Sequence, residues 1–200
     1  MVLDGRVEAI DAFDDYLNEI LFDRSFPQPS EQIKILHVGL INTPVGPMLA
    51  IADHEAIFLL EFLTKKLLRK ELQRLKKRGF VFIRGLSQPL LTIRAELASY
   101  FDGHLTRFET PYYVYGSSFQ QEAWIALTDI SYGETCTYTE QANKIGKPQA
   151  VRAVANANAA NQLSIIIPCH RVIASNGTLG GYSGGIAIKQ WLLNHEKNML

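Results

Sequence analysis

A cysteine, a histidine and an arginine follow one another at Cys169, His170 and Arg171, inside an apolar run over residues 165–173. A thiol attacks as its thiolate, and a nearby imidazole can remove the thiol proton, so this pair is suited to nucleophilic chemistry. The imidazole also needs an acceptor for its other nitrogen, and Glu196 is the candidate carboxylate. The segment therefore predicts a site at which a cysteine is activated by a base.

The same residues have a purely structural interpretation. A buried cysteine that packs as a small hydrophobe is more common than a nucleophile. The apolar run predicts a buried strand, and neighbouring side chains on a strand point to opposite faces. We therefore expect Cys169 and His170 to be coupled through a water molecule or a local bend rather than by direct contact. Cys136 has no base beside it and is expected to be structural.

Composition restricts the class of protein. The chain has 200 residues, 47% of them hydrophobic and 20% charged, with a formal net charge of zero. These values are ordinary for a globular domain. No basic leader precedes an apolar segment, and no segment approaches the roughly 18 apolar residues of a membrane span, so we expect neither a signal peptide nor a membrane helix. The two cysteines are too few for an all-cysteine zinc site or a disulfide framework, which favours a reducing cytosol.

The first half of the chain predicts a small sheet with helices. Apolar residues at helical spacing over 1–26 predict an amphipathic helix, which is followed by a proline-containing linker. The helix predicted over 64–78 has a basic outer face that includes Lys65, and a solvated surface is favoured over a nucleic-acid contact. The remaining elements expected are antiparallel strands at 35–41, 48–52 and 56–62, a strand at 80–84 and a helix at 89–101.

The second half predicts mainly helices. Ser118 is expected to cap a helix over 119–130. The C-terminal helix is expected over 186–197, with Trp191, Leu192 and Leu193 facing inward. Between these two helices the sequence predicts a pair of shorter ones.

This pair of helices is typical of a helix-turn-helix. Thr137 and Glu140 form a capping box for a helix over 138–145, and a proline starts the next helix, which runs to about residue 159. The second helix is rich in alanine, and Arg152 is its only charged residue. Such a surface offers little to base edges in the major groove but allows close approach to the narrow minor groove. A tightly packed, buried helix is the alternative, and both interpretations stay open.

The segment Ile167-Pro168-Cys169-His170-Arg171-Val172 resembles the active-site signature of the O6-alkylguanine-DNA alkyltransferases, a family that includes the C-terminal half of the bacterial Ada protein. The resemblance extends from about residue 119 to residue 196. It includes, in the same order, Thr137-Tyr138, Gly146-Lys147-Pro148, Val151-Arg152-Ala153-Val154, Ala160-Asn161 and Gly181-Tyr182-Ser183-Gly184-Gly185.

This resemblance implies a fold and a division into domains. The fold class is α/β (α+β), and residues 1–34 form a helical extension and linker. Residues 35–115 form a ribonuclease-H-like α/β domain with a small sheet and a linker, although this half resembles the family only in layout and length. Residues 116–200 form a mostly helical, DNA-binding alkyltransferase domain with a helix-turn-helix and an active-site loop.

The resemblance also implies catalytic roles. Cys169 is similar to the nucleophile that accepts the alkyl group. His170 and Glu196 resemble the pair that activates it, with a water between Cys169 and His170. Tyr138 is similar to the tyrosine that crowds the target phosphate and helps protonate the departing guanine. Arg152 resembles the finger that fills the gap left by a flipped nucleotide.

Other positions are assigned to binding by the same resemblance. Asn161 is similar to a hinge between the helix-turn-helix and the active-site segment, and Arg171 is expected to be structural. Many relatives have an arginine where this chain has Ala159, so we expect DNA binding to be weaker here or redistributed to Lys144 and Lys147. The guanine pocket is assigned to Val172, Tyr182 and Ser183, and DNA contacts are assigned to Tyr138, Arg152, Ala153 and Lys147.

The implied function is direct reversal of DNA damage, by irreversible transfer of an alkyl group from O6-alkylguanine, and by expectation O4-alkylthymine, to Cys169. A thioether cannot leave again, so one chain repairs one lesion. No cofactor and no metal are expected. The expected partner is double-stranded DNA that contains alkylated guanine, and no membrane contact is expected. The protein is expected to be a monomer in the cytoplasm, or in the nucleus if the source is a eukaryote. The cysteine-rich zinc module of Ada has no counterpart, which argues against phosphotriester repair.

Two other functions remain open from the residues alone. A helix-turn-helix regulator would bind DNA without chemistry, but the alanine-rich helix argues against sequence-specific readout. A thiol hydrolase using Cys169, His170 and Glu196 would turn over repeatedly, whereas an alkyl acceptor reacts once.

Overall fold

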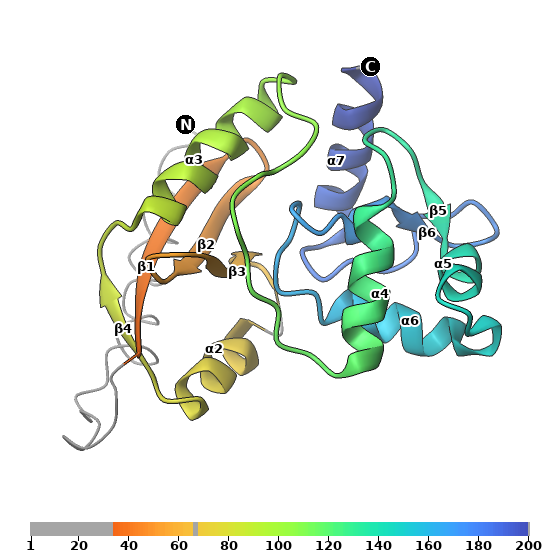
Figure 1. Cartoon of the computed structure of the whole chain (residues 1–200). Helices are drawn as coiled ribbons and strands as arrows, with labels where there is room; N and C mark the ends of the chain where they lie inside the picture. The colour runs from red at the N-terminus through yellow and green to blue at the C-terminus, as the bar shows by residue number, and fades with distance from the viewer. Residues whose placement is uncertain (1–33, 66–67, 200) are drawn as a thin grey trace.

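The computed structural model describes residues 34–65 and 68–199. The helix expected over 1–26 and the linker after it lie outside these residues. The described chain is a mixed α and β structure in which a small sheet with its two helices stands beside a mostly helical unit (Figure 1). The α+β class expected from the sequence is therefore confirmed.

The sheet has four strands in the order β3-β2-β1-β4. β1 pairs antiparallel with β2, β2 pairs antiparallel with β3, and β4 joins the other edge parallel to β1. The expected meander and the later short strand are both present. The strand bounds are Lys34–Thr43 for β1, Gly46–Ala52 for β2, Ile57–Phe62 for β3 and Phe80–Arg84 for β4.

Each face of the sheet has its own helix. Successive side chains of β2 point to opposite faces of the sheet. Met48 and Ala50 lie in one buried cluster with residues of α3, and Leu49 and Ile51 lie in another with residues of α2. The two helices span Leu68–Lys77 for α2 and Gln88–Phe101 for α3. Lys65 precedes α2 and is buried, so its expected place on the basic outer face of a helix was wrong.

The second unit contains four α-helices and a two-stranded pairing of β5 with β6 among the residues described. α5 and α6 are the two short helices of the predicted helix-turn-helix, with a 3-10 turn between them, and α4 packs against both. The bounds are Ser118–Thr128 for α4, Cys136–Thr137 for β5, Tyr138–Lys144 for α5, Val151–Ala159 for α6, Val172–Ile173 for β6 and Ile186–Asn198 for α7.

The caps of α4 and α5 are capping boxes. Thr137 Oγ1 accepts a hydrogen bond from the backbone of Glu140 at 3.1 Å, as the sequence predicted. For α4 the predicted cap, Ser118, was wrong by one residue. Ser117 is the N-cap, and Gln120 three residues later accepts the Ser117 N–H at 3.0 Å. Ser118 has a glutamine at the same spacing, Gln121, so the sequence alone does not distinguish the two serines.

One expected inward residue of α7 was also wrong. Leu192 is fully buried, but Trp191 is 37% exposed and stacks on His195 with ring centroids 4.9 Å apart. Leu193 is partly buried. The buried residues of α7 are Lys189, Leu192, His195 and Glu196, which recur about once per helical turn and so share one face. Trp191, one residue before Leu192, lies at the edge of this face.

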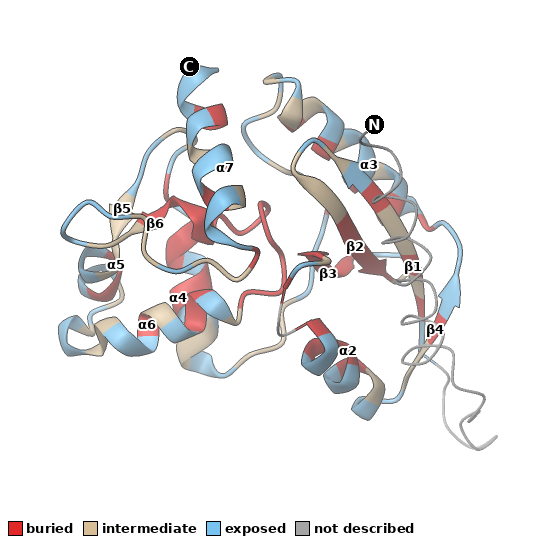
Figure 2. Ribbon diagram, turned by 180° about the vertical axis from the view of Figure 1, so that it is seen from behind, coloured by how far each residue is buried: buried red, intermediate tan, exposed pale blue. Residues whose placement is uncertain are grey.

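The sheet and the helical unit share one hydrophobic cluster. It contains Met48 and Leu60 from the sheet, Trp124 from α4, and Ile165 and Cys169 from the segment 161–171. Buried residues accordingly continue from the sheet through this segment into α4 (Figure 2). The segment therefore lies against the sheet, at the junction between the two units.

A short backbone pairing strengthens this junction. The amide of Leu60 on edge strand β3 donates to the Gln162 carbonyl at 2.9 Å, and the Ser164 amide donates to the Leu60 carbonyl at 2.8 Å. Pairing of this kind satisfies the free edge of a sheet. It also fixes the segment that leads to Cys169.

Candidate active site

The backbone around Cys169 is a series of turns. The buried strand predicted over 165–173 was wrong: Cys169–Arg171 forms a 3-10 turn and only Val172–Ile173 is extended. Pro168 has no N–H for a strand ladder, and Ile165 has a positive φ of 73°. The argument that neighbouring side chains must point to opposite faces of a strand therefore does not apply at Cys169.

Asn161 holds this loop in shape from within. Its amide Nδ2 donates to the Ile167 carbonyl at 2.8 Å, and its Oδ1 accepts from the Leu163 amide at 3.0 Å. Nδ2 also lies 3.2 Å from Cys169 Sγ as a donor. One buried side chain thus replaces the ladder that the loop lacks and contacts the thiol directly.

Glu196 lies at the centre of a buried cluster of hydrogen bonds. Its Oε1 is 2.8 Å from His170 Nε2, accepts from Tyr100 Oη at 2.8 Å, and accepts from Arg171 Nη2 at 3.0 Å. Its Oε2 accepts from Arg171 Nε at 2.8 Å and from the Gly133 amide at 3.1 Å. The carboxylate thereby fixes both the histidine ring and the guanidinium.

The charges in this cluster determine which groups are ionised. Burial alone would raise the pKa of Glu196, but the hydrogen bonds with His170 and Arg171 and the charge of the Arg171 guanidinium hold it well below its usual value. Burial lowers the pKa of His170, and Glu196 only partly offsets this effect. His170 is therefore a neutral imidazole near pH 7. With Nε2 facing the carboxylate, Nδ1 is left as the acceptor nitrogen, and among the described residues it has no hydrogen-bond partner.

The Cys169 thiol is protonated at rest. Burial raises its pKa to about 11, and the hydrogen bond from Asn161 lowers it only in part. A thiol of this kind needs a base to become a nucleophile. His170 is the neutral base next to it in the chain, and its unpartnered Nδ1 is the atom available for that task.

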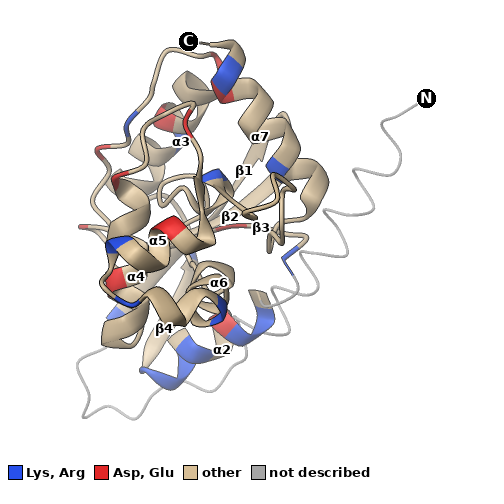
Figure 3. Ribbon diagram, turned by 90° about the vertical axis from the view of Figure 1, so that its right-hand side faces the viewer, with Lys and Arg blue, Asp and Glu red and all other residues tan. Residues whose placement is uncertain are grey.

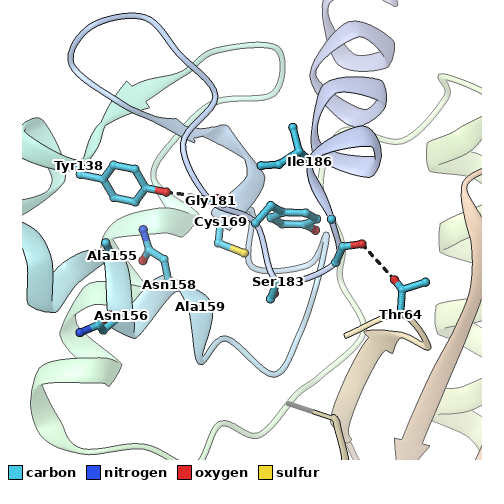
Figure 4. A pocket seen from close by; sticks show the side chains of 13 residues that line it. Thr64, Tyr138, Ala155, Asn156, Asn158, Ala159, Cys169, Gly181, Ser183 and Ile186 are labelled. Carbon is cyan, nitrogen blue, oxygen red and sulfur yellow. Dashed lines mark hydrogen bonds between the residues drawn. The ribbon is translucent and has the colours of Figure 1, made fainter. Parts of the chain in front are cut away.

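Cys169 forms part of the wall of a pocket of about 680 Å³ between α6, the loop before α7 and the end of β3 (Figure 4). Tyr138, Tyr182 and Ser183 also line it. The hydroxyls of Tyr182 and Ser183 are buried, and neither has a hydrogen-bond partner in the described part of the chain. Two buried hydroxyls without partners beside a thiol suit a ligand with polar atoms of its own.

Val172 differs from the other residues assigned to the pocket. It is fully buried in the core and does not line the pocket. Its carbonyl accepts a hydrogen bond from Lys189 Nζ, which also donates to the Gly181 carbonyl at 3.4 Å. Lys189 thus links the Cys169 segment to the pocket loop, and burial lowers its pKa to about 8. Sequence reasoning missed this lysine, because a single base on an amphipathic helix usually faces solvent.

Tyr138 lies at the entrance of the pocket. Its hydroxyl donates to the Gly181 carbonyl at 3.3 Å. Burial raises its pKa, so the phenol is protonated at neutral pH. A side chain on Gly180 would approach the Tyr138 ring within 3.0 Å, and this glycine has a positive φ of 66°. The loop therefore needs a glycine there to pass so close to the ring.

A second buried polar network joins the sheet to the loop. Lys65 Nζ donates to Glu61 Oε1 at 2.5 Å, to Glu71 Oε1 at 2.9 Å and to the Asn161 carbonyl at 2.5 Å. Ser164 Oγ donates to Glu61 Oε2 at 2.8 Å. The sheet unit thus holds the segment 161–164 at both ends, at Asn161 and at Ser164. The sequence signal for Glu61 and Lys65 was an ordinary pair four residues apart, which gave no indication of burial.

The alanine-rich α6 has one buried and one exposed face. Val154 and Ala157 are buried, whereas Arg152, Ala153 and Asn156 are exposed. The buried face confirms tight packing for part of the helix, and the exposed face leaves an alanine-containing surface open to a partner. Arg152 and Ala153 lie outside the pocket, on the open surface next to it.

The lysines near the turn of the helix-turn-helix are already paired. Lys147 forms an ion pair with Glu122, and Lys144 forms one with Asp129 at 3.0 Å. Within residues 34–65 and 68–199, no three histidine, cysteine or acidic side chains come close enough to hold a metal ion. In the same ranges no helix has the length and apolar character needed to cross a bilayer.

Comparison with known proteins identifies the family. Residues 118–198 match the family described as "6-O-methylguanine DNA methyltransferase, DNA binding domain". The chain is 41% identical over 165 residues to the methylated-DNA–protein-cysteine methyltransferase of Methanosarcina barkeri, covering 82% of this chain and 99% of that protein. It is 38% identical over 166 residues to the Salmonella typhimurium protein of the same name, covering 80% and 95%.

A solved structure shows the same relationship. The crystal structure of Mycobacterium tuberculosis OGT in complex with DNA superposes with a TM-score of 0.70 at 36% identity, covering 82% of this chain and 94% of that one. The similarity thus extends over both the sheet and the helical unit. Together with the buried cysteine, histidine and glutamate beside one pocket, it shows that this chain belongs to the methylated-DNA–protein-cysteine methyltransferase family.

Proposed function

We propose that this protein repairs alkylated DNA directly, by moving an alkyl group from O6 of guanine to its own Cys169. The observation that carries the proposal is the position of the thiol, on the wall of a pocket of about 680 Å³ and next to a histidine held by a buried carboxylate. Family membership supports the same reaction. The substrate is duplex DNA, as expected from the DNA-bound relative.

The first step is extrusion of the damaged nucleotide. A base inside a duplex cannot reach a buried thiol, and flipping it out costs a few kcal/mol of stacking and pairing. Arg152 is exposed on α6 and is proposed to fill the gap in the stack. Ala153 on the same face allows the helix to approach the minor groove closely, and Lys147 is proposed to contact a phosphate by exchanging its partner Glu122.

The second step is recognition of the flipped base. Tyr182 and Ser183 each have a buried hydroxyl without a partner in the described chain, and these are proposed to bind polar atoms of the guanine. Val172 is proposed to act through its carbonyl, which holds Lys189 and so the pocket loop. Tyr138 is proposed to sit beside the target phosphate.

The third step is alkyl transfer. The proton of the Cys169 thiol passes through a bridging water to His170 Nδ1, while Glu196 stabilises the resulting imidazolium. The thiolate attacks the alkyl carbon, and the bond between this carbon and O6 breaks with its electrons going to guanine. Tyr138 gives its proton to the departing guanine and regains one from His170. The net result is a thioether on Cys169 and a restored guanine.

The product cannot be reversed by the protein. A thioether is a poor leaving group, and the other cysteine, Cys136, is not among the pocket-lining residues. We therefore propose a single turnover for each chain, without a cofactor. The proposal includes a ribonuclease-H-like character for residues 35–115, an alkyltransferase domain at 116–200, a monomeric state and a cytoplasmic location. Transfer from O4-alkylthymine is proposed as a secondary activity.

The test is to incubate the protein with duplex DNA that contains O6-methylguanine and to measure its intact mass. The proposal predicts a gain of one methyl group in the wild type and no gain in Cys169→Ala. An unchanged wild-type mass would refute it, and would favour a DNA-binding regulator if the duplex is nevertheless bound. Repeated turnover with an unmodified protein would favour a thiol hydrolase.

A further inference from the structure

Helix α2 has a stripe of positive charge on its outer surface. Lys70, Arg74 and Lys77 are exposed and follow one another at spacings of four and three residues, which places them on one face. The only acidic residue of α2 is Glu71, which is buried and bound to Lys65. Glu71 also attracts Arg74, but no acidic side chain lies on the exposed face of the helix beside these three bases, which we call the α2 stripe.

The α2 stripe is unfavourable for the helix by itself. Like charges at these spacings repel one another and destabilise a helix. In the described ranges no carboxylate forms an ion pair with Lys70, Arg74 or Lys77. A polyanion placed against the stripe would remove this repulsion.

The helix-turn-helix provides few cations of its own. Arg152 is the only charged residue on α6, and it is proposed to enter the base stack rather than to contact a phosphate. Lys144 and Lys147 are both held in ion pairs. Because each phosphate contact contributes to duplex affinity, a protein with so few free cations there needs others nearby.

The position of α2 relative to the pocket makes it the candidate. Thr64, a few residues before α2, lines the pocket, and its hydroxyl donates to the Gly184 carbonyl at 3.0 Å (Figure 4). Lys65 is bound to the Asn161 carbonyl. α2 has ten residues, so it reaches about 15 Å away from this anchor at a rise of 1.5 Å per residue.

Helices α2 and α6 both lie in the lower part of the molecule in Figure 1, α2 under the sheet and α6 under the helical unit. Figure 3, which is viewed from the side of α6, shows the basic residues of α2 below and behind this helix. A duplex that lies on α6 with a base in the pocket would therefore pass close to α2 on one side of the lesion. The end of the duplex on the other side would not.

We propose that the α2 stripe binds the phosphate backbone of the duplex on one side of the lesion and so extends the DNA surface beyond the helix-turn-helix. This inference rests on the proposed function for the position of the lesion. It contradicts the interpretation favoured from the sequence, in which the basic face of this helix is only solvated. The stripe recognises phosphate and carries no sequence preference.

The test compares Lys70→Gln/Lys77→Gln with the matched variant Arg107→Gln/Lys197→Gln. The control removes two exposed bases, one before α4 and one near the end of α7, far from α2 along the chain. Glutamine forms helices as well as lysine does, so both variants should fold, and thermal unfolding would verify this. Binding to an undamaged duplex is measured as a function of salt concentration.

Each lost phosphate contact lowers the slope of log affinity against log salt by about 0.9. Between 50 and 200 mM salt, the affinity of the wild type should therefore fall about 12-fold more than that of the α2 variant. The control variant should behave as the wild type. If the α2 variant and the control change the slope equally, or not at all, the proposal is wrong.

Two further measurements complete the test. Shortening the duplex on one side of an O6-methylguanine should abolish the difference between wild type and α2 variant, and shortening it on the other side should preserve it. A difference that survives both truncations would overturn the proposal, since it would reflect only long-range charge. The reaction with free O6-benzylguanine should be the same in all variants. If no protein is alkylated, the proposed function fails, while the salt slopes still decide the role of α2.

Discussion

Replacing Glu196 by glutamine tests how the buried cluster sustains both the fold and the reaction. The carboxylate accepts five hydrogen bonds, from His170, Tyr100, Gly133 and twice from Arg171. Glutamine has the same shape but no charge, and its NH₂ group cannot accept. The substitution is therefore expected to damage the cluster without creating a cavity.

The size of the effect follows from the contacts. If the NH₂ group takes the place of Oε2, the donors of Arg171 Nε and Gly133 N lose their acceptor, at about 1–3 kcal/mol each. A second estimate treats the substitution as the loss of the charge that pairs with the buried Arg171 guanidinium. By this estimate the substitution costs about 3–5 kcal/mol. These estimates describe one loss and are not added. We expect Glu196→Gln to lower the free energy of unfolding by about 3–5 kcal/mol.

The effect on the reaction is expected to be separate. Without the carboxylate, the His170 imidazolium loses its stabilising charge, and base catalysis is typically worth 10²-fold or more, so alkylation of Cys169 should slow by about this factor. The assay is single-turnover alkylation by O6-benzylguanine, below the unfolding temperature of the variant. Tyr100→Phe is the matched control, because it removes one hydrogen bond to Glu196, costs about 1 kcal/mol and should react at the wild-type rate.

The double variant Glu196→Gln/Arg171→Met separates the two roles. Removing both charges leaves no buried ion unpaired, so it should recover at least half of the lost stability. It should not recover the rate. The reasoning would be refuted if Glu196→Gln unfolds like the wild type, or if the double variant reacts as fast as the wild type.

Three further predictions concern other residues. In His170→Ala, the rate of reaction with free O6-benzylguanine should rise about tenfold per pH unit toward pH 11, because the Cys169 pKa is about 11 and only the thiolate reacts. The rate of the wild type should be nearly independent of pH above pH 7. Parallel profiles would contradict the role of His170 as base. Arg152→Ala should slow repair in duplex DNA far more than reaction with free O6-benzylguanine, and equal losses would exclude the finger role. Lys65→Met leaves Glu61 and Glu71 buried without a cation, which raises their pKa values further. The folded state of the variant then binds protons more tightly than the unfolded chain. The melting temperature of the variant should therefore be closest to that of the wild type near pH 4.5, and the difference should grow as the pH rises to 8. The opposite trend would contradict this account.

Local signals in the sequence were sufficient for most elements. The strands of the sheet, the capping box at Thr137 and the two short helices depend on alternation, caps and turn residues, which are local properties. The cap of α4 was misplaced by one residue because Ser117 and Ser118 are chemically equivalent. Each also has a glutamine three residues later, Gln120 or Gln121, so no local signal distinguishes them.

The loop around Cys169 could not be derived in this way. Its apolar run looked like a strand, but it is held by Asn161 and by pairing with β3, and both involve residues that the periodicity of the run does not reveal. The buried Lys65 was missed for a similar reason. Its partners come from β3, α2 and the segment before Cys169, so its burial appears only when these elements meet.

The candidate catalytic residues were named from the sequence, but the reason they can work together was not. Alternation along a strand would have separated Cys169 from His170, whereas the observed 3-10 turn removes that restriction. Arg171 is likewise a local neighbour whose contact with Glu196 depends on the packing of α7. Chemistry could be read from residue types, and geometry required the tertiary structure.

The most direct test of the central claim is to locate the transferred group. The protein is treated with an excess of duplex DNA containing O6-methylguanine, digested, and analysed by mass spectrometry of its peptides. The account predicts one methyl group per chain, found on Cys169 and absent from Cys136, with no further transfer when fresh substrate is added. A methyl group on another residue, or transfer of more than one equivalent per chain, would contradict it.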